Sequence, residues 1–174
     1  MMKKTEWFNR KFPLIEDNGI LPSIIERLIG MPARLEEITR NIDEYILMSK
    51  DGEKWSIKEE AGHLSDLEPL WLGRLNELMN GLAELRVADL TNQRTHSANH
   101  NVTAIEILLE GFRKQRMQFV NQLMHLNDEQ LTYAALHPRL RTPMRIIDLA
   151  YFVAEHDDHH LARIREILTD VPTG

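Results

Sequence analysis

Apolar residues recur every three or four positions in four long stretches of the chain, and strand-like alternation is almost absent. This spacing is typical of amphipathic α-helices that bury one face against other helices. We therefore predict an all-α fold with helices over about 20–44, 56–81, 103–123 and 142–168. The expected core positions are Leu21, Ile24, Leu28, Met31, Leu35, Ile38 and Ile42; Ile57, Leu64, Leu67, Trp71, Leu75 and Leu78; Ile105, Leu108, Phe112, Phe119 and Leu123; and Ile146, Leu149, Val153, His156, His160 and Ile167.

Capping signals mark the ends of the second helix and the start of the third. Ser56 is followed three residues later by Glu59, which is the spacing of a capping box. Gly81 can take the left-handed conformation that commonly ends a helix. Thr103 and Glu106 repeat the capping-box spacing, so we predict that the third helix begins there.

Prolines bear on the first and fourth helices. The apolar stripe of the first helix keeps its face through Pro32, which predicts a helix that is bent there. Pro143 directly after Thr142 fits the first position of the fourth helix, where a missing N–H costs little. Residues 127–130, NDEQ, suggest one short helical turn between the third and fourth helices.

The lengths of the connections predict the topology. Residues 82–102 have weak periodicity and form a link long enough to run back along a whole helix, whereas antiparallel neighbours need only a few residues. The second and third helices should therefore be parallel. We predict a four-helix bundle of up-down-down-up topology, with one long crossover between the second and third helices.

Histidines stand where the core stripe calls for apolar residues. His156 and His160 continue the stripe of the fourth helix, and His63 lies at the edge of the interior face of the second helix. Because the second and fourth helices should run antiparallel, His63 and His160 fall at similar levels. Three imidazoles can bind one cation and leave a coordination position open. The sequence thus predicts a metal site formed by His63, His156 and His160.

A plainer interpretation competes with this site. A single inward histidine is more often a hydrogen-bonded core residue, and a run such as HDDHH is more often a solvated helix face. Three buried imidazoles would each need a partner in the absence of metal, which favours the site. His159 is rotated off the stripe and is expected to be exposed or beside the ligands. Asp157 and Asp158 either orient the imidazoles or face solvent.

Two further polar features allow more than one interpretation. His96 and His100 have the spacing of a helical histidine pair, but they lie in the crossover, where that spacing has meaning only if a helix forms. They are the weaker candidate for a metal site. Gln115 interrupts the apolar stripe of the third helix, and either faces a cavity there or reflects drift in the helical phase.

Composition narrows the function classes. The chain has 174 residues and a formal net charge of −6, and its 21 lysines and arginines are scattered, which argues against nucleic-acid binding. It has no cysteine, so it offers neither a disulfide nor a thiol nucleophile of its own. No apolar run approaches the length of a membrane span, and no secretory leader is evident. We expect a single cytoplasmic domain over residues 1–174, without a membrane or nucleic-acid partner.

Two segments resemble a known family. WSIKEEAGHLSDLEPLWLGRLNEL (55–78) and HDDHHLARIREIL (156–168) look like the signature segments of the DinB-like superfamily, whose metal-binding members share an up-down-down-up four-helix bundle. The family's histidine of the second helix corresponds to His63, and its final pair to His156 and His160. The segment HPRLRTPM departs from the common pattern, with Leu140 and Arg141 where a glycine is frequent. That departure bears on the substrate and leaves the triad intact.

The resemblance implies a nickel or zinc ion and a choice of chemistries. Characterised members include transferases and isomerases that depend on low-molecular-weight thiols such as bacillithiol and mycothiol. A histidine-bound cation would favour the thiolate of an incoming thiol, which suits a chain without cysteine. We therefore expect transfer of a small-molecule thiol to an electrophile. A metal-dependent hydrolase, or a non-catalytic stress-related metal-binding protein, remain alternatives.

An aromatic segment precedes the first predicted helix. Trp7, Phe8, Phe12 and Leu14 come too early to join the main stripe. They are expected to cover one end of the bundle or a neighbouring subunit. Together with the family resemblance, this segment leads us to expect a homodimer.

Overall fold

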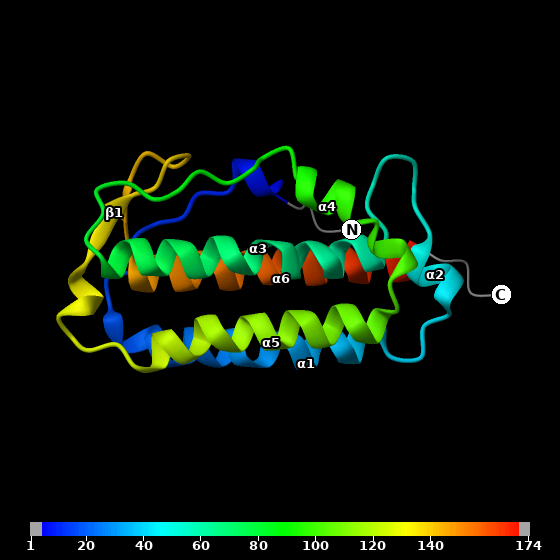
Figure 1. The fold of residues 1–174 in the computed structure, drawn as a ribbon, viewed down its shortest axis with the longest axis horizontal. Coiled ribbons are helices and arrows are strands. Elements are labelled where there is room, and N and C mark those ends of the chain that lie inside the picture. Colours follow the sequence, from blue (N-terminus) through cyan, green and yellow to red (C-terminus); the bar gives the residue numbers. More distant parts are fainter. Residues whose placement is uncertain (1–4, 171–174) are drawn as a thin grey trace.

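Four long helices make up most of the molecule, a computed structural model that describes residues 5–170 (Figure 1). The predicted domain, 1–174, extends beyond the described residues at both ends. The long helices are α1 (Leu21–Thr39), α3 (Ile57–Met79), α5 (Ile105–Met124) and α6 (Ile146–Asp170). Two short helices, α2 (Glu44–Met48) and α4 (Gln93–Ala98), lie in the connections. A two-stranded antiparallel hairpin, β1 (Ala134–Leu136) and β2 (Pro143–Arg145), precedes α6.

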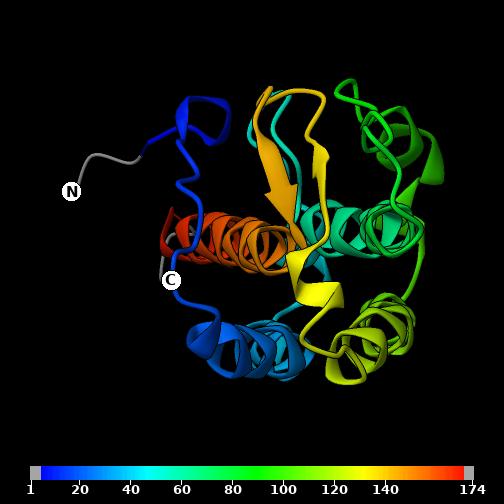
Figure 2. The same cartoon turned by 90° about the vertical axis from the view of Figure 1, so that its left-hand side faces the viewer.

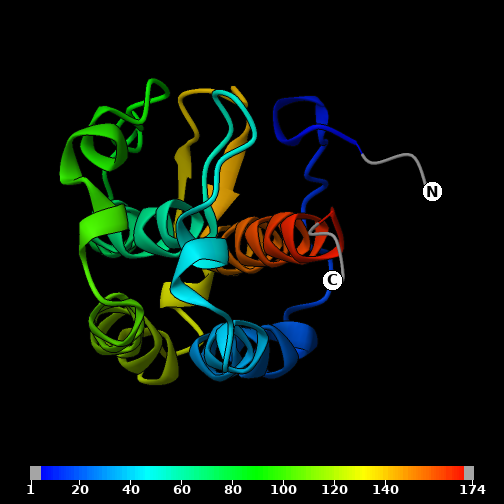
Figure 3. The ribbon, with the colours of Figure 1, turned by 90° about the vertical axis from the view of Figure 1, so that its right-hand side faces the viewer.

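The long helices form a square bundle. α1 and α6 run in one direction and α3 and α5 in the other (Figure 1). Viewed from either end, each helix contacts two neighbours, α1 with α5 and α6, and α3 with α5 and α6 (Figures 2 and 3). The link from α3 to α5 runs back along the length of the bundle, so these two neighbours are parallel. The predicted up-down-down-up topology is confirmed.

The apolar stripes supply the core. Leu28, Met31 and Leu35 of α1 are fully buried, as are Leu75 of α3 and Phe112 of α5. The buried residues fall into two clusters along the bundle, which are separated by polar side chains of α3, α5 and α6. Within residues 5–170, no helix combines the length and apolar character needed to cross a bilayer.

The predicted ends of the second helix are confirmed, whereas the predicted end of the first helix was wrong. Ser56 and Glu59 form the expected reciprocal capping box of α3, and Gly81 follows its end with a positive φ of 68°. The first helix is shorter than the predicted 20–44. It continues through Pro32 but ends at Thr39, because the chain turns at Asn41, whose φ is 57°.

The predicted starts of the third and fourth helices were wrong. Thr103 closes the 3-10 turn His100–Val102, so Ala104 is the N-cap of α5 and makes no side-chain cap. Residues 143–145 form β2, with Met144 paired to Ala135, and α6 begins at Ile146. Pro143 has no N–H to donate, and its position at the start of β2 does not require one, just as the first position of a helix would not.

A candidate metal centre between two antiparallel helices

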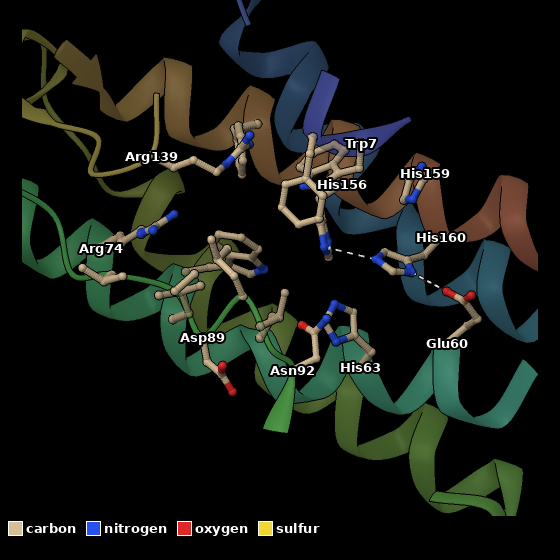
Figure 4. A pocket seen from close by; sticks show the side chains of 18 of the residues that line it. Trp7, Glu60, His63, Arg74, Asp89, Asn92, Arg139, His156, His159 and His160 are labelled. Atoms are coloured by element: carbon tan, nitrogen blue, oxygen red, sulfur yellow. Dashed lines mark hydrogen bonds and ion pairs between the residues drawn. The ribbon is translucent and has the colours of Figure 1, made fainter. Parts of the chain in front are cut away.

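Three buried histidines meet between α3 and α6. His63 comes from α3, and His156 and His160 stand one turn apart on α6 (Figure 4). The Nε2 atoms of His156 and His160 are 3.1 Å apart, and one ring nitrogen from each of the three histidines lies within 4.8 Å of the others. The structure therefore brings together the three predicted ligands. Their ring nitrogens are close enough for all three to bind one ion.

A carboxylate fixes the orientation of His160. Oε2 of Glu60, on α3, lies 2.5 Å from Nδ1 of His160, and both side chains are buried. A carboxylate only accepts, so Nδ1 carries the proton and Nε2 keeps its lone pair toward the other histidines. Such a carboxylate–histidine pair holds the ring and raises its basicity as a ligand.

A longer chain of hydrogen bonds fixes His63. The hydroxyl of Thr95, on α4, donates to Oδ2 of Asp66 at 2.9 Å and lies 3.0 Å from Nδ1 of His63. Because the Thr95 proton is committed to the carboxylate, its oxygen accepts from His63 Nδ1. The Nε2 lone pair of His63 is therefore available for a metal.

His156 has no such support. Its Nδ1 is buried without a hydrogen-bond partner among the described residues. Its ring is packed between Trp7 and Trp71, with centroid distances of 5.1 and 5.5 Å. The aromatic rings hold the imidazole in place, and a metal ion would use the Nε2 that faces His160.

Burial keeps the three imidazoles neutral. Burial, followed by repulsion from His160, lowers the pKa of His63 from an ordinary 6.5 to about 2. Burial, followed by the charge of Arg163, lowers the pKa of His160 to about 3. The pKa of His156 is lowered well below 6.5 by burial and by His160 and His63. Neutral imidazoles are the form that binds metal, so the residues present fit a divalent cation.

A cavity of about 670 Å³ opens from the triad. Its walls are mostly apolar, and residues of the crossover 87–92 and of the N-terminal 3-10 turn Trp7–Asn9 contribute to its lining. The histidines line one side, while Arg74 and Arg139 lie on the other (Figure 4). The apolar residues that line it include Trp7, Phe8, Trp55, Leu67, Leu70, Trp71, Val87, Leu90 and Phe152.

Comparisons with known proteins agree with this geometry. The DinB superfamily matches residues 27–164, which cover most of the chain and all three histidines. The chain belongs to the DinB superfamily. YfiT from Bacillus subtilis, described as a probable metal-dependent hydrolase with an unusual four-helix bundle topology, superposes with a TM-score of 0.80 over 92% of both chains. The two sequences are 18% identical, so this likeness concerns the fold. No curated protein matches the chain.

The acidic neighbours of the histidines have other roles in this DinB-superfamily protein than the sequence suggested. Asp157 is fully buried and pairs with Arg116, whose Nη2 lies 3.0 Å from Oδ1. Arg116 also pairs with Glu68 at 2.6 Å, which joins α3, α5 and α6. Asp158 pairs with Arg27 of α1 at 2.5 Å. Neither aspartate is bonded to a triad imidazole.

His159 and Gln115 are placed differently from one another. His159 is half-buried at the cavity wall, with its Nδ1 3.5 Å from Nη2 of Arg10. Of the two positions expected for it, exposed or beside the ligands, the structure shows the second. Gln115 donates to the hydroxyl of Ser65 at 2.7 Å and does not line the cavity. It links α5 to α3.

The second histidine pair does not form a site of its own among the described residues, and His100 supports the first site. His96 lies in α4, but His100 falls in the following 3-10 turn, which breaks the helical spacing. Nε2 of His100 lies 2.8 Å from Oδ2 of Asp66, the carboxylate behind Thr95. The ring of His100 occupies the space where a Cβ on Gly62 would stand, 2.3 Å from its nearest atom. A glycine immediately before His63 thus admits this support.

The aromatic N-terminal segment lies over the site and not over an end of the bundle. Trp7 and Phe12 pack on Phe152 of α6, with centroid distances of 5.1 and 4.6 Å. Phe8 and Leu14 remain largely exposed. Trp7 and Phe12 are therefore used within the chain, Phe8 also lines the cavity beside Arg139, and the homodimer stays a prediction.

Glu60 and Thr95 are the functional residues that the sequence analysis missed. Glu60 precedes His63 by one helical turn on α3, and this spacing was the available signal. Thr95 lies 32 residues from His63 in the crossover, and no sequence pattern connects the two.

Proposed function

We propose that this DinB-superfamily protein is a metal-dependent enzyme that transfers a low-molecular-weight thiol to an electrophilic substrate. His63, His156 and His160 would hold one divalent nickel or zinc ion. The observation that carries the proposal is the meeting of three neutral imidazoles at the wall of a large apolar cavity. Three protein ligands leave a position for a reactant, whereas a structural zinc site usually has four.

The ion would supply one effect, a lowered pKa of a bound thiol or water at neutral pH. The residues of the chain would orient the ligands and shape the site around them. Glu60 and Thr95 hold the lone pairs of His160 and His63 toward the reactant position. Trp7 and Trp71 pack against the ring of His156 and place apolar surface beside the same position.

The cavity suits thiol transfer. It is lined mostly by apolar and aromatic groups and has room for a small thiol together with an electrophile. Of the four carboxylates at its wall, Glu60 is bonded to His160, Glu84 to Arg141 and Asp89 to the backbone of its own loop. The fourth, Glu53, is an exposed residue of the turn before α3. A thiolate attack asks less of such groups than hydrolysis, which needs proton transfer to the leaving group.

Hydrolysis is the second candidate because of YfiT, a probable metal-dependent hydrolase with the same fold. In that reaction His159 is the group best placed to move a proton, since it lines the cavity and lies outside the triad. Its ring is 5.2 Å from that of His160, measured between centroids.

The test is to load the protein with nickel or zinc and incubate it with a panel of small thiols and monochlorobimane, and separately with esters and amides. We expect thiol conjugation that is lost with the metal. His156→Ala should remove both metal and activity while the helical circular dichroism survives. His159→Ala changes the histidine that directly precedes His160, so it is the matched control and should retain the metal.

Each outcome separates the candidates. Hydrolysis without conjugation would replace the transferase by the hydrolase. Inactivity in both panels with metal firmly bound would leave a metal-binding protein without catalysis. Negligible metal content, with no rise in melting temperature on adding nickel or zinc, would end the metal proposal itself.

A further inference from the structure

Two guanidinium groups lie at the side of the cavity opposite the histidines (Figure 4). Arg74 belongs to α3, and Arg139 to the turn between β1 and β2. Arg74 follows His63 by 11 positions, which is about 16 Å along the helix and nearly the same face. The two arginines and the triad therefore face one cavity from separate positions along it.

Arg74 is buried without a carboxylate partner. Its side chain is 2% exposed, and within residues 5–170 no carboxylate lies at ion-pair distance. Its Nε and Nη2 donate to the carbonyl of Arg86 at 3.2 and 3.0 Å, and Nη1 lies 3.1 Å from Nε2 of His137. A buried arginine is ordinarily paired, so Arg74 is unusual in having no carboxylate in direct contact.

Arg139 adds a second cation with an unused donor. Its Nη2 is buried and has no hydrogen-bond partner among the described residues. The guanidinium lies over the rings of Phe8 and Phe152, at 5.4 and 6.0 Å from their centroids. These aromatic contacts hold the group at the cavity without neutralising its charge.

The nearby carboxylates have other partners. Glu84 pairs with Arg141 at 3.0 Å. Glu77 lies close enough to oppose the burial that lowers the pKa of Arg74 to about 10, but its carboxylate pairs with Arg86 at 2.6 Å and does not contact Arg74. The two oxygens of Asp89 accept from its own loop, at 2.9 Å from the N–H of Thr91 and 2.7 Å from that of Gln93.

Hydrogen-bond donors also outnumber acceptors around His137. Its Nδ1 lies 3.2 and 3.1 Å from the backbone N–H groups of Arg139 and Leu140, while its Nε2 faces Arg74. Burial and the charges of Arg74 and Arg139 lower the pKa of His137 to about 4, so the ring is neutral. A neutral imidazole has one lone-pair nitrogen, yet both nitrogens here face donors.

We propose that Arg74 and Arg139 bind an oxyanion, a carboxylate or a phosphate, at one end of the molecule whose other end reaches the histidines. Guanidinium groups suit such planar, multidentate recognition. The apolar wall between the two ends, with Leu67, Leu70 and Trp71, would hold the middle of that molecule. The link to the reactive end rests on the proposed function, whereas the anion site does not.

The anion site can be tested on metal-free protein with hexanoate, hexyl phosphate and hexanol. Trp7, Trp55 and Trp71 line the cavity, so tryptophan fluorescence reports binding. We expect one or both anions to bind about 10-fold or more tightly than hexanol, and Arg139→Gln to remove most of that difference. Hexanol affinity should not change. The stronger of the two anions identifies the headgroup.

Matched variants make the result decisive. Arg165→Gln changes an exposed arginine on α6 that does not line the cavity and should have no effect. Arg74→Gln should weaken anion binding to a similar extent, and circular dichroism shows whether this variant folds. If it does not fold, the result for Arg139→Gln decides. Equal affinity for hexanol and both anions, or unchanged anion affinity in Arg139→Gln, overturns the proposal.

Chain length tests the link between the two ends. With metal-loaded protein, mercaptopropionate, mercaptohexanoate and mercaptoundecanoate can each be compared with the matching neutral mercapto alcohol. The advantage of the carboxylate should grow with chain length and vanish in Arg139→Gln. An advantage independent of length overturns the link. If metal does not bind, the proposed function fails while the metal-free measurement still decides the anion site.

Discussion

The Nδ1 atom of His160 lies 2.5 Å from Oε2 of Glu60, which joins α6 to α3 beside the triad. The two residues are 100 positions apart in the chain. Since the carboxylate accepts the Nδ1 proton, it determines which nitrogen of His160 is offered to a metal. The contact therefore serves both the packing of two helices and the protonation of a ligand.

Replacing Glu60 by glutamine should weaken metal binding. The amide keeps the size of the side chain but not its charge, so His160 becomes a poorer ligand. We expect a loss of about 10- to 100-fold in zinc affinity, measured against a competing chelator. Glu110→Gln changes an exposed glutamate on α5 and is the control. Unchanged affinity in Glu60→Gln would show that the contact does not tune the site.

Removing the Thr95 hydroxyl should loosen His63. Thr95→Val leaves the imidazole Nδ1 and the Asp66 carboxylate without their shared partner, and we expect about a 10-fold loss of metal affinity. Thr95→Ser keeps the hydroxyl and should restore most of it. The same titration measures both variants. Equal affinities for valine and serine would mean that the hydrogen bond contributes nothing to binding.

Asp157→Asn should destabilise the fold and leave the metal in place. The side chain pairs with Arg116, which is fully buried, and burial raises the pKa of both Asp157 and Glu68, in the latter case to about 7. Weakening a buried pair of this kind costs about 3 kcal/mol. Urea unfolding measures the loss, with the exposed Asp128→Asn as control. Loss of metal at unchanged stability would contradict this role.

Acid should destabilise the metal-free protein through its buried histidines. Their folded pKa values, about 2 for His63 and about 3 for His160, lie below the ordinary 6.5, so only the unfolded chain takes up these protons as the pH falls. Stability should therefore be present above about pH 6.5 and decline below it, by about 1.4 kcal/mol per pH unit for each group.

The control for this pH dependence is a matched pair of variants. His63→Asn should flatten the decline between pH 7 and about pH 5, above the range where most carboxylates titrate. His125→Gln, at an exposed position, should leave it unchanged. Identical slopes in wild type and His63→Asn would show that His63 is not buried as a neutral ring.

The periodicity of apolar residues, together with the length of the crossover, was enough to predict the bundle and the meeting of the three histidines. The stripe on α6 places His156 and His160 inward, and the long crossover makes α3 antiparallel to α6, which sets His63 opposite them. Each of these steps depends on helical geometry, which repeats along the chain.

Contacts between elements without a repeating pattern could not be predicted. Thr95 acts from a short helix in the crossover, and its distance from His63 depends on how that link folds back. Asp157 follows His156 directly, yet a helix turns adjacent side chains about 100° apart, so it meets Arg116 instead of an imidazole. Sequence neighbours are poor guides to which side chains touch.

A local sequence signal that fits both a helix start and a strand end led to the wrong start for the fourth helix. Thr142 and Pro143 suit a helix start, but Pro143 equally suits a strand end, and the pairing of Met144 with Ala135 decides for the strand. A strand of three residues is too short to show alternation. The helix therefore begins three residues after Pro143, at Ile146.

The order in which the chain is made gives the bundle topology a further consequence. α6 is synthesised last of the four long helices, and it carries two of the three histidines and packs against α1, the first. A nascent chain therefore presents His63 alone until α6 has docked, and a metal arriving earlier meets no assembled site. Metal acquisition should follow folding and not guide it.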